Sequence, residues 1–134
     1  MVGAGLGWGA VAGAADTGTL VVRAALLASH KGQVRVAVYK AADQWLKTPA
    51  YSTMLEAGEE VLEWRVPDVP YGTYAVAIYQ DENRNGEHDH NALGVPKEPY
   101  GFSNNARGRF GPAKWKDAQF AFAEPVMELE IDVK

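Results

Sequence analysis

Apolar and polar side chains alternate along several short stretches of this chain, which is the pattern of β-strands with one buried face. The clearest stretch is 126–133, where apolar residues alternate with Glu128, Glu130 and Asp132. Residues 33–39 carry valine at every second position. We predict a strand over each of these two stretches. Further strands are predicted over residues 19–27, 61–66, 72–80 and 117–122.

The stretch 72–80 is apolar on both faces, which is typical of a central strand. Residues 41–47 hold good helix formers and predict a short helix or helical turn. Residues 48–59 show no clear period and are expected to be irregular. Pro67 and Pro70 are expected to bracket a tight connection between two strands.

The fold class that follows is all-β, a single antiparallel β-sandwich of five to seven short strands with one short helix. We place the domain at residues 18–134, because one core of ordinary size fits that length. Residues 81–116 do not alternate and are rich in Asn, Gly, Pro and charge. A loop of this length inside a small domain is usually functional or disordered. Its aromatic residues favour an ordered loop.

Composition excludes several classes of function. The 134-residue chain has a net charge of −4, which gives no basic face for nucleic acid. It has no cysteine, so disulfides, thiolate catalysis and cysteine zinc sites are excluded. The absence of cysteine leaves the cellular compartment open.

The first fifteen residues are small and apolar, with no charge before Asp16. The sequence of 12–14 fits the small-x-small pattern of a signal peptidase site. No Lys or Arg precedes the apolar run, so residues 1–15 are either a signal-peptide remnant or a flexible N-terminal extension. The first interpretation predicts a periplasmic or secreted protein. No apolar stretch reaches the length of a membrane span, so stable membrane insertion is not expected.

Residues 81–89 read D-x-N-x-N-G-x-x-D, which is the first part of a calcium-binding loop. Calcium prefers six to eight oxygen ligands, and side chains at alternating positions can point into one ring. The glycine at position six makes the sharp turn that this ring needs. The predicted ligands are Asp81, Asn83, Asn85, the backbone carbonyl of Glu87, and Asp89.

The calcium motif is incomplete. An EF-hand has a bidentate Glu at position twelve, where this chain has Ala92. Glu98 or Asp117 would have to supply the missing carboxylate. Affinity is expected to be weak, with a Kd of about 10⁻⁴–10⁻³ M. The alternative is a metal-free turn, because Asn85–Gly86 is itself a strong turn sequence.

An enzymatic alternative uses the same loop. His88 and His90 are two positions apart and would share one face of a strand. With Asp81 and Asp89 they could form a metal-dependent hydrolytic site, although zinc would need a further ligand and His30 is the only other histidine. No nucleophile motif such as G-x-S-x-G or H-E-x-x-H is present. Whether the protein is an enzyme stays open, and a non-catalytic protein is favoured.

Several short runs resemble one family of bacterial proteins. The runs are G-x-Y-A-V at 72–76, D-E-N-x-N-G at 81–86, G-V-P-K-E at 94–98, Y-G-F-S-N-N at 100–105 and G-P at 111–112. They are similar to those of the domain-of-unknown-function family 2141, small bacterial proteins usually made with a signal peptide. The resemblance covers roughly residues 18–134, and Y-G-F-S-N-N is its most specific part. It implies a transthyretin-like or immunoglobulin-like sandwich and assigns no catalytic residue.

The favoured hypothesis is a binding or accessory module whose loop, ordered by calcium, contacts an unknown protein or glycan. Aromatic residues and arginines are the side chains that most often dominate such contacts. The candidate residues are Tyr100, Phe102, Arg107, Arg109 and Phe110. Alternatively these rings fold inward as a second apolar cluster beneath the loop. A purely structural envelope domain, pairing with a partner through its sheet edges, is a third possibility.

Overall fold

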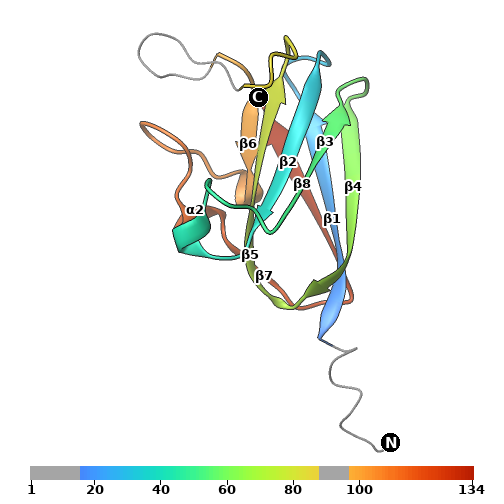
Figure 1. The fold of residues 1–134 in the computed structure, drawn as a ribbon, viewed down its shortest axis with the longest axis vertical. Helices are drawn as coiled ribbons and strands as arrows, with labels where there is room; N and C mark the ends of the chain where they lie inside the picture. The colour runs from blue at the N-terminus through green and yellow to red at the C-terminus, as the bar shows by residue number, and fades with distance from the viewer. Residues whose placement is uncertain (1–15, 88–96) are drawn as a thin grey trace, which may run out of the picture.

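The computed structural model describes residues 16–87 and 97–134, which form two β-sheets packed face to face (Figure 1). The strands are β1 (Thr17–Leu26), β2 (Gln33–Tyr39), β3 (Tyr51–Glu56), β4 (Val61–Pro70), β5 (Gly72–Asp81), β6 (Tyr100–Phe102), β7 (Phe120–Phe122) and β8 (Val126–Val133). The helical turns are η2 (Ala42–Gln44), η3 (Ser103–Asn105) and α2 (Trp115–Ala118). The predicted all-β sandwich is confirmed.

One sheet has the strand order β4-β1-β8, and the other has the order β3-β2-β5-β6 with β7 also pairing with β5. The pair β1–β8 is parallel, whereas the sequence predicted an antiparallel sandwich throughout. The parallel pair arises because the chain leaves β7 in one sheet and crosses to the other before it enters β8. The amide of Thr19 donates to Pro125 O at 2.8 Å, which fixes the start of this pairing.

The core between the sheets is built from the alternating positions that the sequence indicated. Val34, Val36 and Val38 of β2 are buried, and Ile131 and Val133 of β8 are buried opposite them. Full burial of one such side chain contributes about 1.5–3 kcal/mol relative to exposure. Packing of this apolar layer therefore accounts for the association of the two sheets.

Strand β5 is central, as predicted, and is buried on both faces. Its outer face carries Ala75 and Ala77, which contribute to a second apolar cluster. Phe102, Ala113 and Ala118 are its other buried members, and partly buried residues that include Trp45 and Trp115 pack against them. Figure 1 shows α2 and the loop before it on the outer side of the five-stranded sheet.

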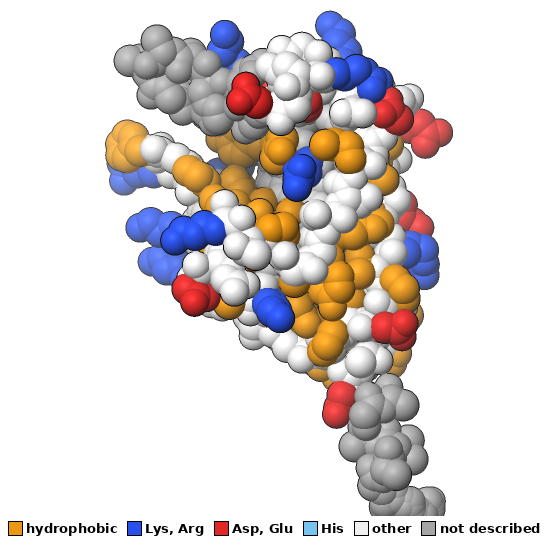
Figure 2. Space-filling model, in the orientation of Figure 1, with side chains coloured by type: hydrophobic (Ala, Val, Ile, Leu, Met, Phe, Trp, Pro, Cys, Tyr) orange, Lys and Arg blue, Asp and Glu red, His pale blue; other side chains and the backbone are white. Residues whose placement is uncertain are grey.

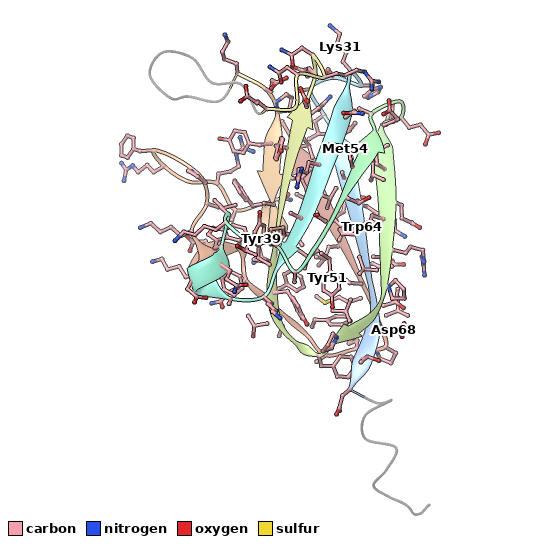
Figure 3. All side chains as sticks on the ribbon, viewed as in Figure 1. Lys31, Tyr39, Tyr51, Met54, Trp64 and Asp68 are labelled. Carbon is pink, nitrogen blue, oxygen red and sulfur yellow. The ribbon has the colours of Figure 1, made fainter. Side chains whose placement is uncertain are left out.

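Trp45 is the centre of the second cluster. Its indole Nε1 donates to Ala113 O at 2.9 Å. Its ring lies 5.1 Å from that of Tyr39, 5.8 Å from Phe102 and 5.9 Å from Trp115. Figure 3 labels Tyr39 on this side of the sheet. Trp45 therefore joins the end of β2 to the segment that precedes α2.

The short helix or helical turn predicted over 41–47 is confirmed as the three-residue turn η2, which ends where Trp45 adopts a non-helical ψ of 124°. The prediction for the next segment is wrong. The segment 48–59, expected to be irregular, contains β3. Its outward-facing positions include exposed Met54, and only part of its inner face is buried. The alternation that identifies a strand is weak there, and hydrogen bonds to β2 hold it in the sheet.

The prediction of a tight connection bracketed by Pro67 and Pro70 is also wrong, because β4 continues through both residues. Strand β4 lies at the edge of its sheet, where a missing amide donor is tolerated. Asp68 has a φ of 57° and the pairing with β1 shifts register nearby, which marks a β-bulge. The bulge is the reason that two prolines can be accommodated in one strand.

Candidate functional site

The turn that follows β5 is organised by the carboxylate of Asp81, whose residue is only 1% exposed. Asp81 Oδ1 accepts from the amide of Asn85 at 3.1 Å, and Oδ2 accepts from the amide of Gly86 at 2.7 Å. Arg84 and Gly86 adopt φ values of 58° and 83°. These two left-handed positions curl residues 81–87 over the carboxylate; glycine adopts this conformation readily, and Arg84 is a non-glycine residue in it.

The two asparagines of the motif continue this arrangement. Asn83 Oδ1 accepts from the amide of Asn85 at 3.3 Å, and Asn85 Oδ1 accepts from the amide of Glu87 at 2.9 Å. The side-chain oxygens of positions one, three and five are therefore turned back toward the chain. Of the predicted calcium ligands, Asp89 lies outside the described residues.

Three contacts attach the turn to the sandwich. The amide of Glu82 donates to Glu98 Oε2 at 2.7 Å, and Glu98 is only 7% exposed. The hydroxyl of Ser29 donates to the carboxylate of Glu82. Arg84 Nη2 lies 2.5 Å from Glu56 Oε1 in an ion pair with β3. The hydrogen bond from Arg84 lowers the pKa of the Glu56 carboxyl below its ordinary value.

Of the two acids considered as the missing calcium ligand, Glu98 lies at the turn and Asp117 does not. Asp117 belongs to α2, and the next residue, Ala118, is hydrogen-bonded to Ser103, which binds Val76. Val76 is five residues from Asp81 along β5, about 16 Å at the rise of a strand. Glu98 is therefore the acid that is placed to complete a site on this turn.

The histidine loop proposed as a metal-dependent site cannot be placed, since His88, Asp89 and His90 lie outside the described residues. Within 16–87 and 97–134, no group of three or more His, Asp or Glu side chains is arranged to hold a metal. The same part of the chain has no helix long and apolar enough to cross a membrane.

The run Y-G-F-S-N-N, at 100–105, connects the two sheets and the α2 turn. Ser103 is buried, and its hydroxyl accepts from the amide of Val76 at 2.8 Å and donates to Ala118 O at 2.6 Å. A Cβ on Gly101 would lie 2.2 Å from Asp132 O, so only glycine allows β6 to approach β8 this closely. The most specific run of the family resemblance is therefore a structural junction.

The two asparagines of the run hold the backbone on either side of this junction. Asn104 and Asn105 adopt φ values of 62° and 51°. Asn104 Nδ2 donates to Asp117 O and Gln119 O at 3.1 and 2.9 Å. Asn105 Oδ1 accepts from the amide of Asp132 at 2.9 Å. Asparagine suits both positions because it tolerates left-handed backbone and carries an amide that can bond nearby main chain.

The candidate partner-binding residues divide into two groups. Phe102 is 5% exposed and packs against Trp45 and Tyr100, which is half-buried. Arg107 lies over the Tyr100 ring at 3.8 Å and donates to Tyr100 O at 2.8 Å and Lys134 O at 3.3 Å. Tyr100, Phe102 and Arg107 are therefore engaged in the fold.

Arg109 and Phe110 form the second group and lie on a projecting loop. Phe110 is 96% exposed, and the Arg109 guanidinium is 5.8 Å from its ring centroid. A Cβ on Gly108 would lie 1.9 Å from Gly111 O, so the loop closes tightly on itself. Between this loop and α2 is an open hollow of about 570 Å³, lined by residues 107–112, 114, 116 and 117. In Figure 2 basic side chains gather near the tip of the loop.

Lys114 and Lys116 line this hollow together with the arginines, and sequence analysis missed both. A signal was present, because four of the ten residues from 107 to 116 are Lys or Arg in a chain of net negative charge. The four cations could be recognised as one patch only after the chain was known to fold back at Gly108.

Comparison with known proteins gives a family and no activity. A family model described as "Uncharacterized protein conserved in bacteria (DUF2141)" matches residues 22–130. No curated protein and no solved structure matches the chain. The matched range covers the turn at 81–87, the junction at 100–105 and the projecting loop.

Proposed function

The chain belongs to the bacterial family DUF2141, and from this premise we propose that it is a non-catalytic binding module of the periplasm or cell exterior, with a calcium site on the turn 81–89. The observation that carries the proposal is the buried Asp81 carboxylate, held beneath the turn by the amides of Asn85 and Gly86. These bonds fix the first ligand position before any ion arrives, which lowers the ordering cost of binding.

The hydrogen bonds within the turn are compatible with a bound cation. A carboxylate has about four acceptor sites, and an amide oxygen has two. The amides of Asn85 and Gly86 occupy two of these sites on Asp81. The Asp81 carboxylate therefore retains acceptor capacity for calcium.

The proposed ligands are the side-chain oxygens of Asp81, Asn83 and Asn85, the carbonyl of Glu87, and Asp89. Two carboxylates and neutral oxygens suit a Kd of about 10⁻⁴–10⁻³ M, the range of extracellular calcium modules. Glu98 could supply a third carboxylate, because it already binds the amide of Glu82 at the base of the turn. Calcium would then stabilise the start of the long loop at residues 81–116.

The proposed binding role rests on the C-terminal part of the same loop, residues 81–116. Arg109 and Phe110 project from a loop whose base is held by Arg107 and closed at Gly108. A rigid loop that presents an aromatic ring and a cation loses little entropy when a partner binds. The proposed partner is a protein, a glycan or another surface that complements an exposed aromatic ring and a cation.

Thermal unfolding of the whole chain, in chelator and in several millimolar calcium, tests the calcium site. Calcium that binds only the folded state at this affinity stabilises it by about 1–2 kcal/mol, a shift of several degrees in Tm. Asp81→Asn is expected to abolish the calcium-dependent shift. Asp117→Asn is the matched control and should retain it, because Asp117 lies next to Ala118, which is linked through Ser103 to Val76, five residues from Asp81 along β5. An unchanged wild-type midpoint in calcium would refute the proposed site.

A further inference from the structure

We propose that residues 107–117 dock on an anionic phospholipid surface, with Phe110 entering the boundary between headgroups and acyl chains. The cations beside it, Arg109, Lys114 and Lys116, would contact headgroup phosphates. This inference deepens the proposed binding function by naming the partner of the same loop. It does not require the calcium site, so the two can be tested separately.

The charge distribution supports an anionic partner. Residues 107–117 hold four cations and one acid, a net charge of +3, whereas the whole chain carries −4. The remainder of the chain therefore carries −7. An anionic membrane attracts such a basic patch and repels the acidic body, which orients the molecule with this loop toward the surface.

Phe110 distinguishes a membrane from a soluble partner. It is 96% exposed, whereas the next most exposed large apolar residue among those described, Leu27, is 60% exposed. A single projecting ring is a small patch for a protein interface, which needs an extended complementary surface. A bilayer needs no preformed pocket, because its interface accepts one apolar ring beside cations.

The loop is built to keep the ring outward. Arg107 bonds Tyr100 O and Lys134 O at its base, and the close approach of Gly108 to Gly111 O closes it. Folding of Phe110 onto the body would require these contacts to rearrange. Since the ring is held in water without apolar contacts that bury it, its transfer into an apolar layer is favourable.

The open hollow behind the loop suits headgroup phosphates. Arg109, Lys114 and Lys116 all line it, with Asp117 as the single acid of the lining. Arginine and lysine are the side chains that bind phosphate oxygens, arginine through a bidentate fork. The hollow would therefore accept phosphates at the same time as the tip enters the interface.

Co-sedimentation with vesicles tests the proposal, using the whole chain in chelator at about 0.1 M salt, where charges more than about 10 Å apart are largely screened. Vesicles of equal parts phosphatidylcholine and phosphatidylglycerol should bind the protein, and vesicles of phosphatidylcholine alone should not. Lys114→Gln with Lys116→Gln should weaken binding by roughly twenty-five-fold, since each cation near an anionic surface contributes a factor of about five. Phe110→Ala should weaken binding by about tenfold or more.

Two matched controls keep the test specific. Lys31→Gln with Arg65→Gln removes the same charge from exposed positions in β4 and before β2, and should change binding by about twofold or less. Leu27→Ala removes an exposed apolar side chain elsewhere and should leave binding unchanged. The unfolding midpoint of each variant in chelator checks that it is folded.

The outcomes distinguish the membrane proposal from the calcium-site proposal. The membrane assignment would be overturned if neutral vesicles bound the protein as well as anionic vesicles do. It would also be overturned if the control variants lost as much vesicle binding as the loop variants. Binding to soluble dextran sulfate without binding to vesicles would also overturn it, in favour of an acidic glycan. Vesicle binding without a calcium-dependent shift in Tm would remove the calcium site alone. A calcium-dependent shift without vesicle binding would leave the binding module without this partner.

Discussion

Arg107 covers the ring of Tyr100 at 3.8 Å and, through the same guanidinium, bonds the main-chain oxygen of Tyr100. A second bond reaches Lys134 O, and Lys134 is itself paired with Tyr100 through N–H···O bonds of 3.1 and 3.3 Å. Tyr100 begins β6 in one sheet, and Lys134 follows β8 in the other. A single side chain thus joins the two sheets at the base of the projecting loop.

Arg107→Ala is expected to destabilise the fold by about 1–2 kcal/mol, from the loss of the cation–π contact and the bonds to two carbonyls. Arg107→Lys should recover only part of this loss, because an ammonium lacks the planar fork that bonds both oxygens. Urea unfolding measures both changes. The control is Arg109→Ala, whose guanidinium lies 5.8 Å from the ring centroid of the exposed Phe110. Equal effects at the two arginines would contradict the role of Arg107.

Ser103→Ala is expected to cost about 1–3 kcal/mol, because the buried amide of Val76 and the carbonyl of Ala118 lose their hydroxyl partner. Hydrogen exchange of the Val76 amide should also accelerate relative to the rest of β5. Ser52→Ala is a suitable control, since Ser52 is exposed on β3. Unfolding free energies of the two variants should differ clearly, and similar values would argue against the junction.

Gly108→Ala is expected to open the projecting loop, because the new methyl would lie 1.9 Å from Gly111 O and must displace main chain. Limited proteolysis with trypsin should then cleave after Arg109 faster than in the original protein. Gly111→Ala is the matched control, because a Cβ at Gly111 meets nothing within 4 Å. Identical cleavage rates in the two variants would show that the loop does not depend on this close approach.

The ion pair between Arg84 and Glu56 predicts a pH dependence of stability. The folded-state pKa of Glu56 is lowered, first by the hydrogen bond from Arg84 and then by that from Gln33. A lowered pKa means that the contribution is present above the unfolded value, about 4.3 for Glu, and is lost as pH falls through the folded value. The contribution is small because both groups are exposed and screened by salt.

Unfolding curves of Arg84→Gln and of the original protein, recorded across the acid range at low salt, check this prediction. The two stabilities should differ near neutral pH and converge once Glu56 is protonated. Glu59→Gln, at an exposed position before β4, should show the same pH dependence as the original protein. A difference between Arg84→Gln and the original protein that persists unchanged at the lowest pH would exclude the ion pair as its cause.

The strands that could be predicted from the sequence are those with one face in the core. Residues 126–133 alternate fully and form β8, and 33–39 form β2 with the predicted bounds. Strand β3 was missed because its edge position leaves the alternation weak. The continuation of β4 through Pro67 was missed because proline normally ends a strand, and only an edge position with a bulge permits it.

The sequence predicted part of the candidate site, as it predicted part of the strands. The turn after β5 follows from its own sequence, since the amides of Asn85 and Gly86 both donate to the Asp81 carboxylate within six residues. The sequence left open whether Phe102 folds inward or faces a partner, and it gave no role in the fold to Arg107, because their partners Trp45 and Lys134 are distant in sequence. The type of side chain suggested a contact residue in both cases, and the tertiary structure determined which contacts it makes.

The sequence alone determined the all-β class, the central strand 72–80 and the turn at 81–86, because these depend on periodicity and on backbone preferences within a few residues. Only the tertiary structure decided the parallel pairing of β1 with β8 and the burial of Phe102 beneath the long loop. It also decided that Lys114, Lys116 and Arg109 line one hollow. The reason is that an alternating pattern states that a face is buried without stating against which segment, and that choice depends on packing across the whole chain.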